Sequence, residues 1–194
     1  MIFGLGTGRC GTMSLSDLLW RNGLRVVHEQ RPLLPWKPDL ELLRWKLDRL
    51  SHTVDGDVSS TYLHYIPEIV RISPESKFVY LERPMEEVAQ SFLKKTPRIN
   101  HWSTNEFLGE GESHHELWTP CFPQYEFPKE DAIKAYWLEY TLKIRDIADL
   151  YQNKIFFLTT EQLNDEATIK RMFDFLGTPR ELVRPARQLN KGKR

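Results

Sequence analysis

The sequence predicts an α/β fold: a single domain over residues 1–194 with a central, mainly parallel β-sheet flanked by helices as a three-layer sandwich. Short apolar segments alternate along the chain with longer segments whose apolar residues recur at helical spacing. Polar or glycine-rich residues follow most of the apolar segments, as they do at the carboxyl ends of parallel strands. The 194 residues are enough for one compact domain with a substantial core.

The strands are predicted from runs of apolar, aromatic and β-branched residues. Lys77–Glu82, with the sequence KFVYLE, is the clearest of these runs, and Asp55–Ser59 is the weakest. The other strands are expected at Ile2–Leu5, Leu24–Val27 and Lys154–Thr159.

The helices are predicted from apolar stripes and from the residues that begin and end them. Asn22-Gly23 is a typical helix end, Asp39 can cap a helix, and Pro84 is favourable in a first turn, where its missing N–H costs nothing. The helices expected are Thr12–Arg21, a helix after Asp39 with Leu40, Leu43, Leu47 and Leu50 in one stripe, Leu63–Ile72, Pro84 to about Lys95, Pro128–Tyr151 and Asp165–Leu176.

Composition limits the possible partners. Lys plus Arg and Asp plus Glu are 27 each, so the formal net charge is zero and nothing attracts the whole molecule to nucleic acid or an anionic membrane. The N-terminus lacks the long apolar run of a signal peptide or membrane span. The two cysteines, Cys10 and Cys121, do not suggest a disulfide framework. We therefore expect a cytoplasmic protein; its oligomeric state stays open.

A glycine-rich turn, residues 6–11, separates the first strand from the first helix. Its glycines let backbone N–H groups approach an anion, and Arg9 adds a charge. The ATP-type motif requires a lysine where Thr12 stands, which disfavours a kinase or ATPase. Gly6, Gly8 and Gly11 do match the dinucleotide-binding pattern G-x-G-x-x-G, so a Rossmann-type NAD(P) oxidoreductase is an alternative.

Two motifs together resemble one known family. The segment Gly8–Leu15 is similar to the 5′-phosphosulfate loop of sulfotransferases, and Phe78–Pro84 followed by Ser91 is similar to their 3′-phosphate segment. A dehydrogenase has no reason to contain the second motif. The resemblance implies a fold like that of P-loop NTPases and a transferase that uses 3′-phosphoadenosine 5′-phosphosulfate (PAPS), releases 3′-phosphoadenosine 5′-phosphate (PAP) and needs no metal.

The resemblance also implies the nucleotide-binding residues. Arg83 can pair with the 3′-phosphate as a planar fork, Ser91 can add a hydroxyl, and Lys191 near the end of the sequence can add a charge. Arg9 would stabilise the charge that develops on the leaving group. The residues expected to bind the 5′ end are Gly8, Arg9, Cys10, Gly11, Thr12, Met13 and Ser14.

A base must take the proton of the acceptor, and two adjacent residues are candidates. Glu29-Gln30-Arg31 resembles the catalytic-glutamate region of tyrosylprotein sulfotransferases, which favours Glu29. His28 is the rival, because small-molecule sulfotransferases use a histidine, although from another segment. Adjacent residues on an extended strand point in opposite directions, so only one of the two is expected to face the site.

The segment 96–127 is too long for a simple connection and is expected to be a lid or acceptor-site insertion. The acceptor is expected to be a small molecule, a carbohydrate or a lipid. A non-catalytic nucleotide-binding protein of the same fold is a further alternative. Aromatic residues in the long loops would favour a sugar or lipophilic acceptor; they are Trp36, Trp102, Trp118, Phe122 and Tyr125.

Overall fold

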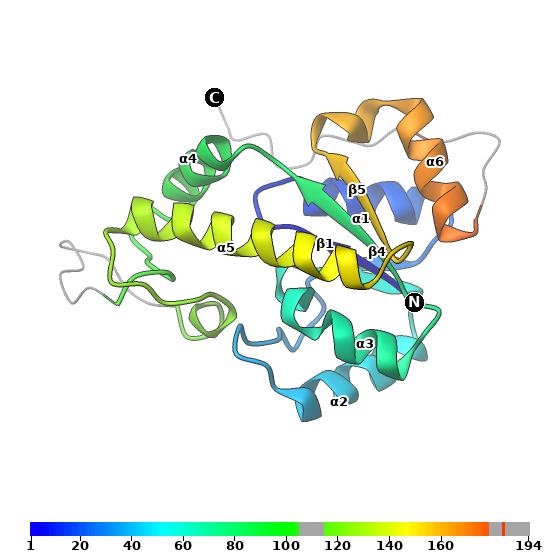
Figure 1. Ribbon diagram of the computed structural model, residues 1–194, viewed down its shortest axis with the longest axis horizontal. Helices are drawn as coiled ribbons and strands as arrows, with labels where there is room; N and C mark the ends of the chain where they lie inside the picture. The colour runs from blue at the N-terminus through cyan, green and yellow to red at the C-terminus, as the bar shows by residue number, and fades with distance from the viewer. Residues whose placement is uncertain (105–114, 179–183, 185–194) are drawn as a thin grey trace.

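The computed structural model describes residues 1–104, 115–178 and 184 (Figure 1). Its strands form a five-stranded sheet in the order β2-β3-β1-β4-β5, and all neighbouring strands are parallel. This topology confirms the predicted α/β fold. The strands are β1 (Ile2–Leu5), β2 (Val26–His28), β3 (Gly56–Val58), β4 (Lys77–Glu82) and β5 (Ile155–Thr159).

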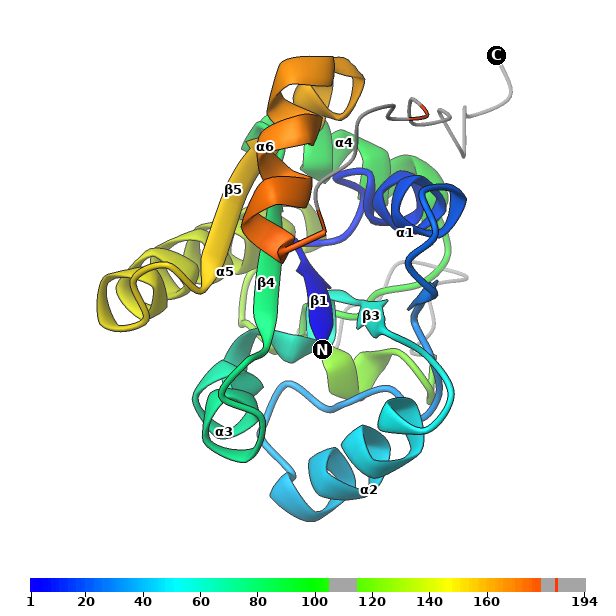
Figure 2. The ribbon, with the colours of Figure 1, turned by 90° about the vertical axis from the view of Figure 1, so that its right-hand side faces the viewer.

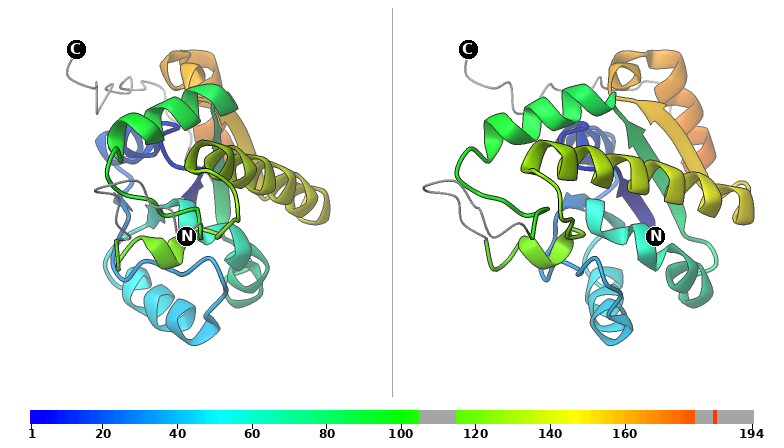
Figure 3. Two further views of the ribbon diagram at one scale, coloured as in Figure 1. Left: turned by 90° about the vertical axis from the view of Figure 1, so that its left-hand side faces the viewer. Right: turned by 60° about the vertical axis from the view of Figure 1, so that its left-hand side comes forward.

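Helices cover both faces of the sheet and complete the three layers. In Figure 2, α1 and α6 lie on one face, and α2 and α3 lie on the opposite side. The long α5 crosses the same face as α3 with α4 beside it, as Figure 3 shows from two directions. The helices are α1 (Thr12–Arg21), α2 (Leu40–Ser51), α3 (Ile66–Ile72), α4 (Met85–Lys95), α5 (Lys129–Leu150) and α6 (Glu166–Leu176).

The apolar core has two parts, one on each face of the sheet. Phe78 and Tyr80 of β4 belong to the part that packs under α2–α5, whereas Val79 and Leu81 belong to the part under α1 and α6. Successive residues of a strand point to opposite faces, so a strand covered on both sides must be apolar throughout. This requirement explains why the inner strand β4 is the clearest in the sequence.

Two predicted elements differ from the structure. Leu24 donates its N–H to Leu19 O at 3.0 Å and so belongs to the turn that ends α1, which delays β2 until Val26. The helix expected from Leu63 is a 3₁₀ helix at Ser60–Tyr65, and α3 begins only at Ile66. Pro67 explains the break, because proline has no N–H for a preceding helical turn and is tolerated in the first turn only.

The apolar stripe of α2 also differs from the prediction. Leu40 is 41% exposed and lies outside the core, although Leu43, Leu47 and Leu50 are buried as expected. Lys46 is buried with them, at 1% exposure. A fully buried lysine among leucines requires polar partners, which are described below.

The described parts of the 96–127 segment pack against the domain. Trp102 is fully buried and Phe122 is 7% exposed, and both rings contact Phe92 of α4. These two aromatics therefore belong to the core and are not available to stack on a sugar, contrary to the prediction. Across the described ranges, none of the helices combines the length and apolar character needed to cross a membrane.

Candidate nucleotide and transfer site

The turn between β1 and α1 forms a concave backbone at the carboxyl edge of the sheet. Gly8, Arg9 and Gly11 have φ angles of 82°, 56° and 95°, which is the left-handed region. A Cβ at position 8 would lie 3.0 Å from Cζ of Phe92, so a side chain there would crowd this ring in addition to straining the backbone. Left-handed residues just before a helix turn successive N–H groups toward one point, which suits an anion.

Three hydroxyl groups from distant elements hold this turn in place. Tyr136 donates to Thr7 O at 2.9 Å, and Tyr140 accepts from Gly6 N–H at 3.2 Å. Thr160, just after β5, donates to Cys10 O at 2.8 Å. Thr160 follows a predicted strand and was expected at this edge of the sheet, but sequence reasoning missed the two tyrosines. The available signal for them was their spacing of four residues, which places both on one face of a helix.

The predicted residues of the turn and of α1 have different surroundings. Cys10 is fully buried, and burial raises the pKa of its thiol to about 11, so only its backbone can face a ligand. Thr12 and Ser14 are each 8% exposed, and Met13 is 38% exposed. The predicted 3′-phosphate ligand Lys191 lies outside the described residues.

Arg9, Arg83 and Ser91 are brought together although they are up to 82 positions apart. Arg83 Nη1 donates to Arg9 O at 2.7 Å, and Arg9 Nε donates to Ser91 Oγ at 3.1 Å. Burial lowers the pKa of Arg9, and repulsion from Arg83 lowers it further. Two guanidinium groups that repel each other in a half-buried site create a local demand for an anion.

Arg83 has further contacts that set its position. Its Nε pairs with Glu87 Oε2 at 3.0 Å, so the guanidinium also takes part in a surface ion pair with the first turn of α4. Trp137 donates from its indole N–H to Arg83 O at 2.9 Å. Through this bond Trp137 fixes the backbone position of Arg83.

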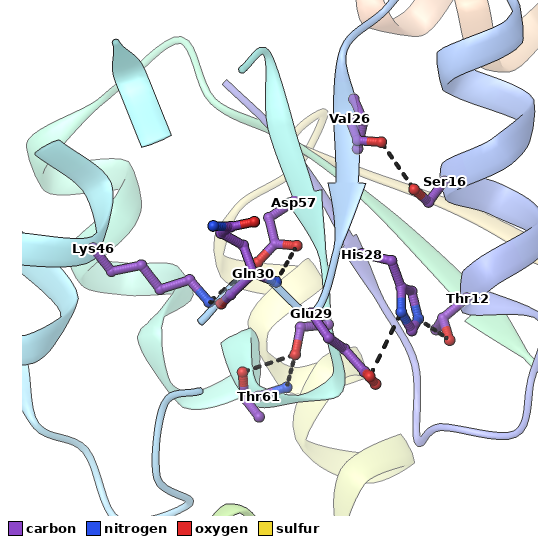
Figure 4. A network of polar contacts seen from close by, with 10 residues as sticks. Thr12, Ser16, Val26, His28, Glu29, Gln30, Lys46, Asp57 and Thr61 are labelled. Carbon is purple, nitrogen blue, oxygen red and sulfur yellow. Dashed lines mark hydrogen bonds and ion pairs between the residues drawn. The ribbon is translucent and has the colours of Figure 1, made fainter. Parts of the chain in front are cut away.

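The two candidate bases lie side by side at the end of β2, with His28 as its last residue. Glu29 has a φ of 53°, and its Oε2 lies 3.6 Å from His28 Nδ1 (Figure 4). The other ring nitrogen of His28, Nε2, is 3.0 Å from Thr12 Oγ1. The expectation that the two side chains diverge is wrong, because the left-handed backbone of Glu29 ends the extended strand and turns its carboxylate toward the histidine.

Their surroundings change the protonation of both residues. Burial raises the pKa of Glu29 to about 7, Asp57 adds to that rise, and the charges of Arg9 and Lys46 oppose it. Burial lowers the pKa of His28, which is therefore neutral near pH 7. The groups that contact the Glu29 carboxylate or act on its pKa are Arg9, His28, Lys46 and Asp57. A carboxylate that titrates near neutral pH is able to accept a proton from a substrate.

The raised pKa of Glu29 has a consequence for stability. The folded state binds more protons than the unfolded state between the ordinary value of 4.5 and about 7, so Glu29 lowers stability progressively as pH rises through that window. We expect Glu29→Gln to raise the melting temperature at pH 8 and to leave it nearly unchanged at pH 5. Scanning calorimetry at the two pH values measures this difference. An equal change at both values would show that the pKa is not raised.

We also examined the described residues for metal ligands. Within them, no group of three or more His, Cys, Asp or Glu side chains is placed to hold a metal ion.

Comparisons with known proteins point in one direction. A family model described as "Sulfotransferase domain" matches residues 1–179. No curated protein sequence matches the chain.

Solved structures share the fold at low sequence identity. A sulfotransferase from Alicyclobacillus acidocaldarius has a TM-score of 0.56 at 17% identity, over 95% of this chain and 83% of the other. Mouse sulfotransferase SULT7A1 complexed with PAP has a TM-score of 0.57 at 14% identity, over 93% of this chain and 60% of the other. A sulfotransferase domain from the curacin biosynthetic pathway has a TM-score of 0.54 at 16% identity, over 93% of this chain and 75% of the other.

Proposed function

The chain belongs to the sulfotransferase family, and we propose that it transfers a sulfuryl group from PAPS to a hydroxyl or amine of an acceptor by in-line displacement. One observation carries the proposal: Arg83 and Ser91 both contact Arg9 of the glycine-rich turn, so the two predicted anion-binding motifs form one site. The complex of mouse SULT7A1 with PAP supports the choice of nucleotide.

We assign the two ends of the nucleotide to different elements. The amides of the turn, together with Thr12 and Ser14, hold the 5′ end at the start of α1. Arg83 and Ser91 hold the 3′-phosphate, with Arg83 using its planar fork. In this assignment the guanidinium of Arg83 exchanges its contacts with Arg9 O or Glu87 for phosphate oxygens. The 3′-phosphate role of Lys191 stays a prediction.

The transfer step requires one base and one cation. The acceptor oxygen or nitrogen attacks sulfur, and the bond from sulfur to the bridging phosphate oxygen breaks, so that PAP leaves with that oxygen. Glu29 takes the acceptor's proton, and Arg9 stabilises the charge on the leaving side. We choose Glu29 over His28 because burial raises the proton affinity of the carboxylate and lowers that of the imidazole, whose Nε2 already contacts Thr12.

For the acceptor, the proposal names a class of molecule and a location near the base. The Thr119–Cys121 turn of the 96–127 segment lies beside the 31–38 loop, since Trp36 N–H donates to Pro120 O at 2.8 Å. The charge of Glu29 contributes to the raised pKa of Cys121, so this turn is placed to border an acceptor near the base. We propose a small-molecule, carbohydrate or lipid acceptor. The lid role of the segment and the cytoplasmic location stay predictions.

Nucleotide binding tests the assignment of Arg83. We expect calorimetry to give a dissociation constant for PAP on the order of micromolar or lower, and much weaker binding of AMP, which lacks the 3′-phosphate. Arg83→Ala should weaken PAP binding to the level of AMP and leave AMP binding unchanged. Arg71→Ala, which removes a surface arginine paired with Glu68, is the matched control and should change neither. Equal affinities of the wild-type protein for PAP and AMP would refute the assigned role.

Two alternatives predict other results. A non-catalytic nucleotide-binding protein would bind PAP but transfer no labelled sulfate to any member of an acceptor panel. The dinucleotide-binding alternative loses its support, because the chain belongs to the sulfotransferase family and Arg83 contacts the turn that would bind the pyrophosphate.

A further inference from the structure

A buried ion pair lies against the segment that follows the proposed base, Glu29. Lys46 Nζ of α2 is 3.1 Å from Asp57 Oδ2 of β3, and the two side chains are 1% and 0% exposed. Removing two charges from water is costly, and well-packed apolar residues in the same place are often as stable or more so. A buried pair is therefore weak evidence of a role in stability, and its contacts have to show what it does.

Three hydrogen bonds join this pair to the residues that follow Glu29. Lys46 Nζ donates to Gln30 O at 2.5 Å and to Pro32 O at 3.1 Å, so that with Asp57 its three N–H groups are all used. Asp57 Oδ1 accepts from Gln30 N–H at 3.2 Å. Tyr62, on the 3₁₀ helix after β3, donates its hydroxyl hydrogen to Asp57 Oδ2 at 2.7 Å and so helps to fix the position of that carboxylate.

These contacts matter because the backbone of Glu29 is in an unfavourable conformation. A non-glycine residue with a φ of 53° costs free energy and persists only where its surroundings over-determine it. Glu29 N–H donates to Val58 O at 3.0 Å, so β3 holds the chain up to the point where its direction changes at Glu29. Gln30 and Pro32, held by Lys46 and Asp57, are the residues after it.

We propose that Lys46 and Asp57 are positioning residues for the base: they hold Gln30 and Pro32 and thereby direct the Glu29 carboxylate toward His28 and Arg9. Figure 4 shows the arrangement, with Lys46, Gln30 and Asp57 on one side of the end of β2 and His28 and Thr12 on the other. The proposal rests on the assignment of Glu29 as the base. It makes the α2 lysine part of the transfer machinery although it does not touch the reacting atoms.

The test is the double variant Lys46→Met/Asp57→Asn, which removes both charges together and leaves no unpaired buried ion. We expect kcat to fall about 10- to 100-fold, the size that a small misplacement of a catalytic group produces. PAP affinity should be unchanged, because Arg9, Arg83 and Ser91 lie on other elements. The acid limb of the pH–kcat profile should move below neutral, since a released Glu29 is more hydrated and titrates nearer its ordinary pKa.

A merely structural role gives a different pattern. It lowers the fraction of folded enzyme, and with it the number of PAP sites, but leaves kcat per PAP site at the wild-type value. The matched control is Arg44→Met, which removes an α2 side chain paired with Glu68 at 3.0 Å, away from Gln30. This control should keep the wild-type kcat and pH profile.

A double-mutant cycle separates this inference from the function on which it rests. In a Glu29→Gln background, the Lys46/Asp57 changes should reduce the residual rate by less than about 2-fold, because the pair acts through the missing carboxylate. If Glu29→Gln leaves activity intact, the assignment of the base fails. If Glu29→Gln lowers activity but the Lys46/Asp57 variant keeps the wild-type kcat and profile, the positioning role fails.

A milder variant decides the question should the double variant not fold. Tyr62→Phe keeps the buried ring against Phe3 and removes one hydrogen bond to Asp57. We expect it to fold, to bind PAP normally and to lower kcat several-fold, with the acid limb displaced in the same direction. Wild-type kcat and an unchanged acid limb in Tyr62→Phe would overturn the proposal.

Discussion

Glu29→Gln is expected to lower kcat by about 10²- to 10⁴-fold, the usual contribution of a general base. Glutamine keeps the size and hydrogen-bonding capacity of the side chain but cannot accept the acceptor's proton. PAP affinity should stay near that of the wild type, since the 3′ and 5′ contacts come from other residues. Steady-state rates with sulfate transfer to a reactive acceptor, combined with PAP calorimetry, measure both quantities.

The pH dependence of kcat is a second test of the role of Glu29. Because burial raises the pKa of Glu29 to about 7, the base is protonated below that value, and kcat should rise with pH through neutrality. This rise should be absent from the residual activity of Glu29→Gln. His28→Asn is the matched control for the neighbouring candidate: it should keep the rise in kcat. A large loss of kcat in His28→Asn together with full activity in Glu29→Gln would reverse the assignment.

Arg9→Ala is expected to lower kcat by about 10²- to 10³-fold, the cost of losing one donor to developing negative charge. The side chain of Arg9 extends from the glycine-rich turn to Ser91, so its cation can reach the leaving oxygen. PAP binding should weaken only in part, because the turn amides and Arg83 remain. Single-turnover rates and calorimetry on the same preparation separate the two effects.

Arg9→Lys is the control for charge. It keeps a cation but replaces the planar guanidinium with a flexible ammonium, so it should recover part of the lost rate. Full activity in Arg9→Ala would remove Arg9 from the mechanism. Arg9→Ala and Arg9→Lys with the same deep loss would show that the guanidinium geometry matters more than its charge.

Much of the fold could be predicted from local sequence. The bounds of α1 and β4 are those expected, because a helix end at Asn22-Gly23 and a doubly covered apolar strand leave strong local signals. The prediction failed where a turn contact at a helix end or a proline decided the backbone. Leu24 is held by the end of α1, and Pro67 divides one expected helix into a 3₁₀ helix and α3.

The candidate site also contains residues that the sequence predicted and residues that only the structure brought into it. The sequence by itself predicted the glycine-rich turn, because the backbone of a strand–turn–helix junction depends on residues close together in the chain, and the resemblance to sulfotransferases added Arg83 and Ser91 as predicted ligands. Only the tertiary structure decided that Glu29 turns toward His28, that Lys46 and Asp57 lie behind it, and that Tyr136, Tyr140 and Thr160 hold the turn. The reason is physical: a buried polar group takes its partner from whatever the packed fold brings near, and here those partners are as many as 150 positions away.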